Sequence, residues 1–369
     1  MTNKRTVLKS LLMSTACTML LMSNPSADAC TALHLTAKDG GVVVGRTMEF
    51  GIDTLSDAVV VPAGTTLTSS LEDKSKGIHY TTKYGIVGNN FLNKHMIVDG
   101  MNEKGLYTGA LYLPGYASYP EGTEENAAKS MAPEDYVAWL LGNFSTVAEV
   151  KENYNKVMLV QHPIKDIGGA SFPGHFLVTD GSGASVVIEP TDNTLKLFDN
   201  PLGILTNSPT FDWHMTNLSN YANLSATNVA PLDFSGTTIN TFGQGSGLVG
   251  LPGDYTPPSR LVRAVAFSQA AIKLTSARET VLQVFHIMNS FDIPLGTIQE
   301  KQDDAIHYDY TQWTSVADLK NMTFAIKTYK NQSIRSIDVR KALAEAGKEI
   351  KVIELDLEQS IEDISTQFK

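Results

Sequence analysis

Apolar and β-branched residues occur in short runs along much of the chain. The first two runs, residues 31–38 and 42–48, are separated by Asp39-Gly40-Gly41, a sequence typical of a tight turn. We therefore expect an antiparallel hairpin at this point. Further strands are predicted at residues 58–61, 84–87, 176–179, 185–189, 194–198, 203–205, 308–313, 323–329 and 351–357.

Helical patterns lie between these strands. Residues 133–144 begin with a proline in the first turn, and residues 146–149 form a capping-box pattern that starts a second helix. The longest helical patterns cover residues 259–274 and 278–291. This order of elements predicts an α+β protein in which helices cover sheets. The sequence has no internal repeat or convincing linker, so residues 30–369 are expected to form a single domain.

The N-terminus has the pattern of an export signal. Basic residues at positions 4, 5 and 9 precede the mostly apolar run 11–22, and Ala27-Asp28-Ala29 has the form of a signal-peptidase site. The apolar run is shorter than the roughly 20 residues that cross a bilayer. We therefore expect residues 1–29 to be removed and the mature protein to be periplasmic or secreted in a bacterium, without membrane insertion.

A lipoprotein signal is the alternative for this segment, because Cys30 follows the cleavage site directly. Such signals usually have a larger aliphatic residue three positions before the cysteine. Ala27 stands there, and Asp28 follows it, so the match is poor. Lipidation of Cys30 stays an open alternative.

The charge of the mature chain argues against two classes of partner. The whole chain has 29 basic and 39 acidic residues, and the leader holds three of the former and one of the latter, which leaves a net charge of −12. Nucleic acids and anionic membranes attract basic surfaces. We therefore expect no nucleic-acid partner.

The number and position of the cysteines indicate a reactive thiol. Of the two in the chain, Cys17 lies in the leader, so Cys30 is the one thiol of the mature protein. An unpaired thiol in an oxidising compartment is either reactive or an intermolecular link. At a new N-terminus the α-amino group lies on the same residue and can act as the general base. The sequence thus favours Cys30 as a nucleophile.

Cofactor and metal patterns are weak. Residues 245–250 match GxGxxG, but the proline-rich segment 251–258 that follows cannot form the helix of a dinucleotide site. The eight histidines are scattered, and no HExxH or Cys/His cluster occurs. We expect neither a cofactor nor a metal.

Five segments together resemble the choloylglycine hydrolase and penicillin V acylase family of N-terminal-nucleophile hydrolases. The resemblance runs along most of residues 30–340, and the segments occur in the family's order. They are residues 30–33 (CTAL), 45–49 (GRTME), 99–106 (DGMNEKGL), 205–214 (LTNSPTFDWH) and 243–254 (GQGSGLVGLPGD).

The resemblance implies a four-layer αββα sandwich and hydrolysis of a linear C–N amide through a thioester, without a cofactor. In it, Cys30 corresponds to the nucleophile and Arg46 to an arginine that favours the thiolate. Asn207 and the backbone N–H of Tyr112 correspond to the donors that hold the oxyanion, and Arg260 to a second supporting arginine. One position departs from the family, because Glu49 stands where an aspartate usually engages the amine of the nucleophile.

Position 112 bears on the substrate. Bile salt hydrolases of the family tend to have asparagine there and penicillin V acylases tyrosine, so Tyr112 favours a penicillin V acylase-like enzyme for small-molecule amides with an apolar acyl group. Conjugated bile salt hydrolysis, acyl-homoserine lactone hydrolysis and a non-catalytic binding protein or lipoprotein on the same fold remain alternatives. Family members often form homotetramers, and residues 243–258 are the loop that could serve such an assembly.

Overall fold

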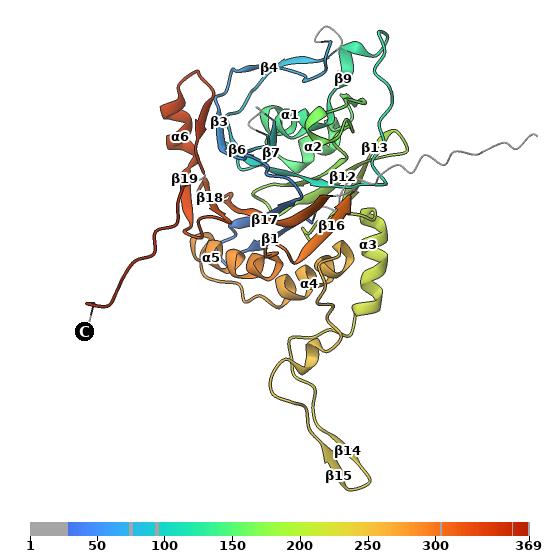
Figure 1. Ribbon diagram of the computed structural model, residues 1–369, viewed down its shortest axis with the longest axis vertical. Coiled ribbons are helices and arrows are strands. Elements are labelled where there is room, and N and C mark those ends of the chain that lie inside the picture. The colour runs from blue at the N-terminus through green and yellow to red at the C-terminus, as the bar shows by residue number, and fades with distance from the viewer. Residues whose placement is uncertain (1–28, 74–76, 93–95, 303–304, 356, 368–369) are drawn as a thin grey trace, which may run out of the picture.

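The computed structural model describes residues 29–73, 77–92, 96–302, 305–355 and 357–367. The predicted export signal, at residues 1–29, lies outside these residues except for Ala29. Two antiparallel sheets pack face to face and helices cover their outer faces (Figure 1). The predicted αββα sandwich is confirmed.

The first sheet has the strand order β1-β2-β17-β18-β19, and β16 pairs with β17. Helices α4 and α5 pack against its outer face. These elements are β1 (Thr31–Thr36), β2 (Val42–Phe50), β16 (Ile298–Gln302), β17 (Ala305–Asp318), β18 (Thr323–Thr328), β19 (Arg335–Asp338), α4 (Pro257–Ala270) and α5 (Ala277–Met288).

The second sheet has the order β13-β12-β11-β8-β7-β6-β3-β20, and α1 packs against β7 and β8. The strands are β3 (Ala58–Val61), β6 (Ile86–Asn90), β7 (Ile97–Asn102), β8 (Tyr107–Tyr112), β11 (Gly174–Thr179), β12 (Ser185–Thr191), β13 (Thr194–Asp199) and β20 (Lys351–Ile353). The remaining helices are α1 (Tyr136–Asn143), α2 (Val147–Asn153), α3 (Phe211–Asn217) and α6 (Val339–Ala346).

Three small strand pairs lie outside the sandwich, of which β14–β15 is the tip of a hairpin that projects far from the body (Figure 1). The pairs are β4 (Thr66–Thr68) with β5 (His79–Thr81), β9 (Ser130–Met131) with β10 (Met158–Leu159), and β14 (Leu232–Phe234) with β15 (Thr237–Ile239). Among the described residues, no helix has the length and apolar character needed to cross a membrane.

The alternation of side chains along β1 and β2 separates two cores. Cys30, Ala32 and Val44 belong to the core between the sheets, whereas Leu33 and Val43 belong to the core beneath α4 and α5. Successive residues of a strand point to opposite faces, so both faces of these strands are apolar. This alternation directs the residue before β1 into the space between the two sheets.

Most predicted elements are confirmed, with two differences. Residues 203–205 form no strand; Leu205 makes an isolated bridge with Ala32 instead, with N–O distances of 2.8 and 3.0 Å. The predicted strand 351–357 is shorter, because β20 ends at Ile353. The predicted helix start is confirmed by Thr146, whose hydroxyl accepts the N–H of Glu149 at 3.2 Å, and the Glu149 carboxylate accepts the N–H of Ser145 at 2.7 Å.

Candidate active site

Cys30 lies at the start of β1 and is 2% exposed. Arg46 projects from β2 beside it, with Nη2 3.7 Å from Cys30 Sγ. The guanidinium is fixed by Nη1 donating to the carbonyl of Val98 at 3.1 Å and Nη2 donating to that of Ala110 at 2.8 Å. The ring of Trp313 completes the enclosure, with its centroid 4.9 Å from Arg46 Cζ. A buried cation therefore faces the thiol in a set position.

Burial and charge oppose each other at this thiol. Burial raises the pKa of the Cys30 thiol, and the positive charge of Arg46 lowers it, as expected of that residue. The effect of burial is the larger one, so the pKa is raised overall. Arg46 alone does not make the thiol acidic, and a base close to Cys30 is needed to deprotonate it at neutral pH.

The sequence did not single out Asp99, a fully buried carboxylate near Arg46. It accepts hydrogen bonds from the hydroxyls of Tyr107 and Ser315. Burial lowers the pKa of Arg46, but the nearby Cys30 and Asp99 outweigh this and raise it. Asp99 thus helps to keep Arg46 charged. An aspartate inside the apolar run 96–101 was the signal available in the sequence.

The side-chain amide of Asn207 joins three segments of the chain. Its Oδ1 accepts the N–H of Cys30 at 2.6 Å and Nη2 of Arg260 at 2.7 Å. Its Nδ2 donates to the carbonyl of Tyr112 at 2.8 Å. Because two donors face one end of the amide and an acceptor faces the other, only this orientation satisfies all three partners.

Arg260 lies in the first turns of α4 and contacts the backbone of Cys30. Its Nη1 donates to the carbonyl of Cys30 and, at 2.8 Å, to the hydroxyl of Thr31; its Nε donates to the carbonyl of Tyr255 at 2.8 Å. Burial lowers the pKa of Arg260 to about 10, against the opposing charge of Glu49. Arg260 therefore stays protonated at neutral pH.

Glu49, the residue that departs from the family pattern, is also brought to this site. Its carboxylate accepts the hydroxyl of Thr47 at 3.1 Å and that of Thr311 at 2.6 Å. Burial raises the pKa of Glu49 to about 8, although Arg260 and the two hydroxyls lower it. Although glutamate is longer than the family's aspartate, the charge of Glu49 still interacts with that of Arg260. The same negative charge raises the pKa of the Cys30 thiol.

Tyr112 contributes its ring to an aromatic cover over the thiol. The ring meets Phe50 and Phe172 edge to face, at centroid distances of 5.4 and 5.5 Å, and Phe50 meets Phe91 at 5.2 Å. These four rings and Cys30 line a cavity of about 10 Å³, roughly the room one water molecule needs. A substrate must displace some of these rings to reach the thiol.

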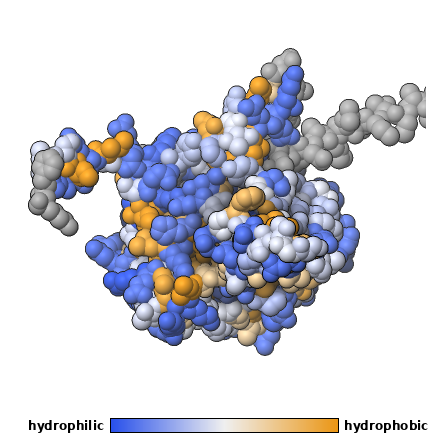
Figure 2. All heavy atoms as spheres, turned by 90° about the horizontal axis from the view of Figure 1, so that it is seen from below, coloured by the Kyte–Doolittle hydropathy of each residue, from blue (hydrophilic) through white to orange (hydrophobic). Residues whose placement is uncertain are grey.

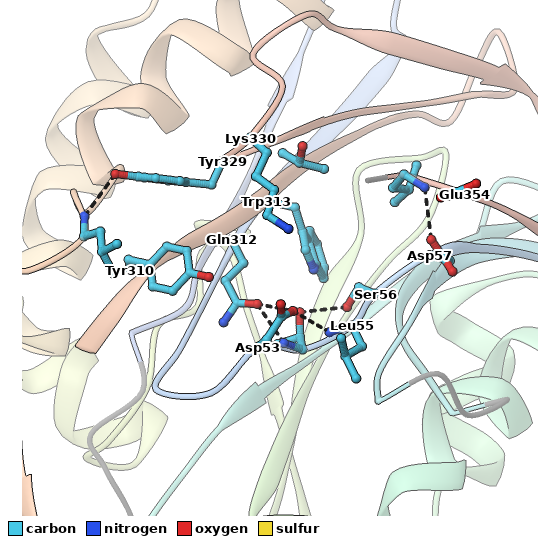
Figure 3. Close-up of a pocket in the computed structure, with 14 residues that line it drawn as sticks. Asp53, Leu55, Ser56, Asp57, Tyr310, Gln312, Trp313, Tyr329, Lys330 and Glu354 are labelled. Carbon is cyan, nitrogen blue, oxygen red and sulfur yellow. Dashed lines mark hydrogen bonds between the residues drawn. The ribbon is translucent and has the colours of Figure 1, made fainter. Parts of the chain in front are cut away.

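A larger cavity of about 480 Å³ lies elsewhere, and Trp313 is part of its wall (Figure 3). The loop 53–57 forms another part, and Gln312 fastens it by accepting the N–H of Thr54 at 2.8 Å. Among the described residues, this cavity and the one at Cys30 share no lining residue.

All six residues predicted for the site are thus gathered around one thiol. The described residues contain no group of three or more His, Cys, Asp or Glu side chains that could hold a metal ion. The arrangement provides a thiol, two buried cations and a side-chain amide in contact with the backbone of Cys30, which suits attack of the thiol on a carbonyl group.

Comparisons with known proteins agree with this chemistry. Residues 30–350 match the family model of linear amide C–N hydrolases, choloylglycine hydrolase family. A bile salt hydrolase/transferase of Clostridium perfringens is 35% identical over 345 residues, which cover 91% of this chain and 100% of that protein.

Two solved structures share the fold. A variant of the conjugated bile acid hydrolase from Clostridium perfringens has a TM-score of 0.79 and 32% identity, covering 91% of this chain and 100% of that one. The penicillin V acylase from Agrobacterium tumefaciens has a TM-score of 0.71 and 23% identity, covering 88% of this chain and 90% of that one. The chain belongs to the choloylglycine hydrolase family and is a hydrolase of linear C–N amides.

Proposed function

We propose that the protein hydrolyses conjugated bile acids, cleaving the amide between the acid and its amino-acid conjugate. The observation that carries this proposal is the 35% identity with a protein named as a bile salt hydrolase/transferase, over 91% of this chain and the whole length of that protein. A conjugated bile acid hydrolase of Lactobacillus gasseri supports it further, at 30% identity over 82% of this chain and 95% of that protein.

The penicillin V acylase-like interpretation of Tyr112 has weaker support. The acylase named above is 23% identical, which supports the fold and not the substrate. The contact of Tyr112 with Asn207 uses a backbone carbonyl, which any residue at this position would provide. Penicillin V remains the second candidate because aromatic rings surround the cavity at the thiol and suit a flat phenoxyacetyl group.

The proposed reaction begins with attack of Cys30 Sγ on the amide carbonyl. The α-amino group of Cys30 takes the thiol proton and passes it to the leaving amine, so that a thioester forms and the conjugating amino acid departs. One hydrogen of Asn207 Nδ2 already serves Tyr112. The other, with the backbone N–H of Tyr112, is assigned to the oxyanion, where each donor is worth about 3 kcal/mol. Water then releases the bile acid.

This mechanism requires removal of residues 1–29, which we propose as part of the same function, with export to the periplasm or medium. Cleavage before Cys30 would place a free amine 2.6 Å from Asn207 Oδ1, next to the thiol. The burial of Cys30 argues against lipidation, because a folded chain offers no room for an acyl-glyceryl group on Sγ. The intact mass of the purified protein tests this: a chain starting at unmodified Cys30 is expected, and an acylated one contradicts the mechanism.

Assembly into a homotetramer is a further part of the proposal. The hairpin of β14 and β15 exposes large apolar side chains, and Phe242 just beyond it is fully exposed. Figure 2 views the molecule from the side on which this hairpin projects, with apolar residues in separate spots. A second copy of this chain would cover them. Sedimentation of the mature protein and of a Phe242→Ser variant tests the idea, since a wild-type monomer would contradict it.

Rates on three substrates test the main proposal. Glycocholate, penicillin V and an acyl-homoserine lactone are compared side by side, and kcat/KM is expected to be highest for glycocholate. A higher kcat/KM for penicillin V would refute the bile acid proposal and favour the second candidate. Cys30→Ser is expected to fold normally and lose most activity on every substrate, while full activity of Cys30→Ala would contradict the mechanism.

A further inference from the structure

Two fully buried histidines that the proposed mechanism does not use lie against the backbone of Asn207. His175 comes from β11 and His214 from α3, and each is 0% exposed. Neither was predicted as a site residue. Their contacts are with successive carbonyl groups, those of Thr206 and Asn207.

The hydrogen-bond partners fix where the protons of His175 lie. Its Nε2 is 2.7 Å from the carbonyl oxygen of Thr206, and since a carbonyl has no hydrogen to give, Nε2 must donate. Its Nδ1 is 3.0 Å from Oε1 of Glu189, itself buried, so a proton lies between these two atoms. His175 is thereby oriented from both ends of the ring.

His214 holds the next carbonyl in the same way. Its Nε2 donates to the carbonyl oxygen of Asn207 at 2.8 Å. Burial lowers the pKa of His214 to about 4, so the ring is neutral and its one hydrogen sits on Nε2. Within the described part of the chain Nδ1 has no hydrogen-bond partner. An unsatisfied buried acceptor costs about 1–3 kcal/mol, which reduces the stability gained from the bond to Asn207.

One carboxylate joins the two histidines. Oε1 of Glu189, which faces His175, also accepts the N–H of Phe211 at 3.0 Å. Phe211 is the first residue of α3, the helix that carries His214. Glu189 therefore positions His175 by a direct hydrogen bond. It positions His214 indirectly, through its bond to the first residue of α3.

We propose that His175, Glu189 and His214 are positioning residues that aim the side chain of Asn207 at the nucleophile. Holding two successive carbonyls fixes the backbone on both sides of the Asn207 Cα. The direction of its side chain is then set, with Oδ1 2.6 Å from the nitrogen of Cys30 and Nδ2 2.8 Å from the carbonyl of Tyr112. Misplacement of a catalytic group by about 1 Å can cost on the order of 100-fold in rate.

The test compares donors of different reach at position 214. His214→Gln carries an amide N–H where Nε2 stood, His214→Asn is too short to reach the carbonyl, and His214→Leu has no donor. On the substrate that the wild type cleaves best, kcat is expected to fall about 100-fold in the Leu and Asn variants and to recover at least tenfold in the Gln variant. KM should stay within about twofold, because neither histidine lines the cavity at the thiol.

A double variant decides whether His214 acts through Asn207. If it does, Asn207→Ala with His214→Leu is no slower than Asn207→Ala alone. Additive losses, or equal activity of the Gln and Asn variants at matched melting temperatures, would overturn the proposal. If the Leu variant does not fold, the Gln and Asn pair still decides. A wild type inactive on all three substrates would contradict the proposed function, and the contact of His214 would then be tested by the carbonyl chemical shift of Asn207 in the same variants.

Discussion

Replacing the buried carboxyl group of Glu49 by an amide is expected to stabilise the fold increasingly as the pH rises. Burial raises the pKa of Glu49 from an ordinary value of 4.5 to about 8 in the folded chain. Between these two values the unfolded chain releases the proton while the folded chain keeps it. The stability contributed by this group is therefore complete below pH 4.5 and is lost as the pH rises to 8.

The size of the effect follows from the two pKa values. Each unit of difference is worth about 1.4 kcal/mol, so the whole difference amounts to about 5 kcal/mol, of which about 4 kcal/mol falls between pH 5 and pH 8. Glu49→Gln keeps the shape and can still bond to the hydroxyls of Thr47 and Thr311, but it does not ionise. The free energy of unfolding of Glu49→Gln minus that of the wild type should rise across this range.

Urea unfolding at pH 5, 6, 7 and 8 measures this difference, with Glu121→Gln, on the exposed surface, as the matched control. The chains compared first retain Ala29, so that the nitrogen of Cys30 is an amide as in the structure. In chains that begin at Cys30, the positive α-amine should lower the pKa of Glu49 and reduce the slope. If the free energy of unfolding of Glu49→Gln minus that of the wild type stays constant or falls as the pH rises, the reasoning is refuted. If this difference rises equally steeply in chains with and without Ala29, the α-amine does not affect the pKa of Glu49.

Substitutions at three other positions give further predictions. Trp313→Phe should keep an aromatic ring over Arg46, whereas Trp313→Leu should be less stable by about 1 kcal/mol in urea unfolding; equal stabilities would contradict the contact. Gly45→Ala should lower the free energy of unfolding by about 1–3 kcal/mol, because the new Cβ would lie 2.3 Å from Val284 Cγ1. An unchanged melting temperature would contradict this and show that α5 can shift to accommodate the methyl group. Tyr112→Asn opens the aromatic cover and should raise kcat/KM for glycocholate relative to penicillin V by about tenfold; a fall in that ratio would contradict a role of the ring in substrate choice.

The sequence predicted elements well where apolar periodicity was strong and poorly where glycines and polar residues interrupted it. The hairpin of β1 and β2 and the long helices α4 and α5 were recognised from alternation and helical spacing. Strands β7 and β8, which carry glycines and polar residues, were not predicted. They form because each is paired with a strand of the second sheet on both sides, a stabilisation that the composition of the strand itself does not show.

For the site, the sequence by itself indicated the family and a candidate nucleophile, because a single thiol next to a predicted cleavage site and five motifs in the family's order are local properties of the chain. The resemblance also named Arg46, Asn207 and Arg260. Only the tertiary structure decided what those residues contact. Burial in the folded chain raises the pKa of Glu49, and folding places Asp99 close to Arg46. It also places His175 and His214 in hydrogen-bond contact with the carbonyl groups of Thr206 and Asn207. The physical reason is that burial and hydrogen bonding join residues 230 or more positions apart, as in the pairs Arg260 with Cys30 and Thr311 with Glu49, and both depend on how the sheets pack.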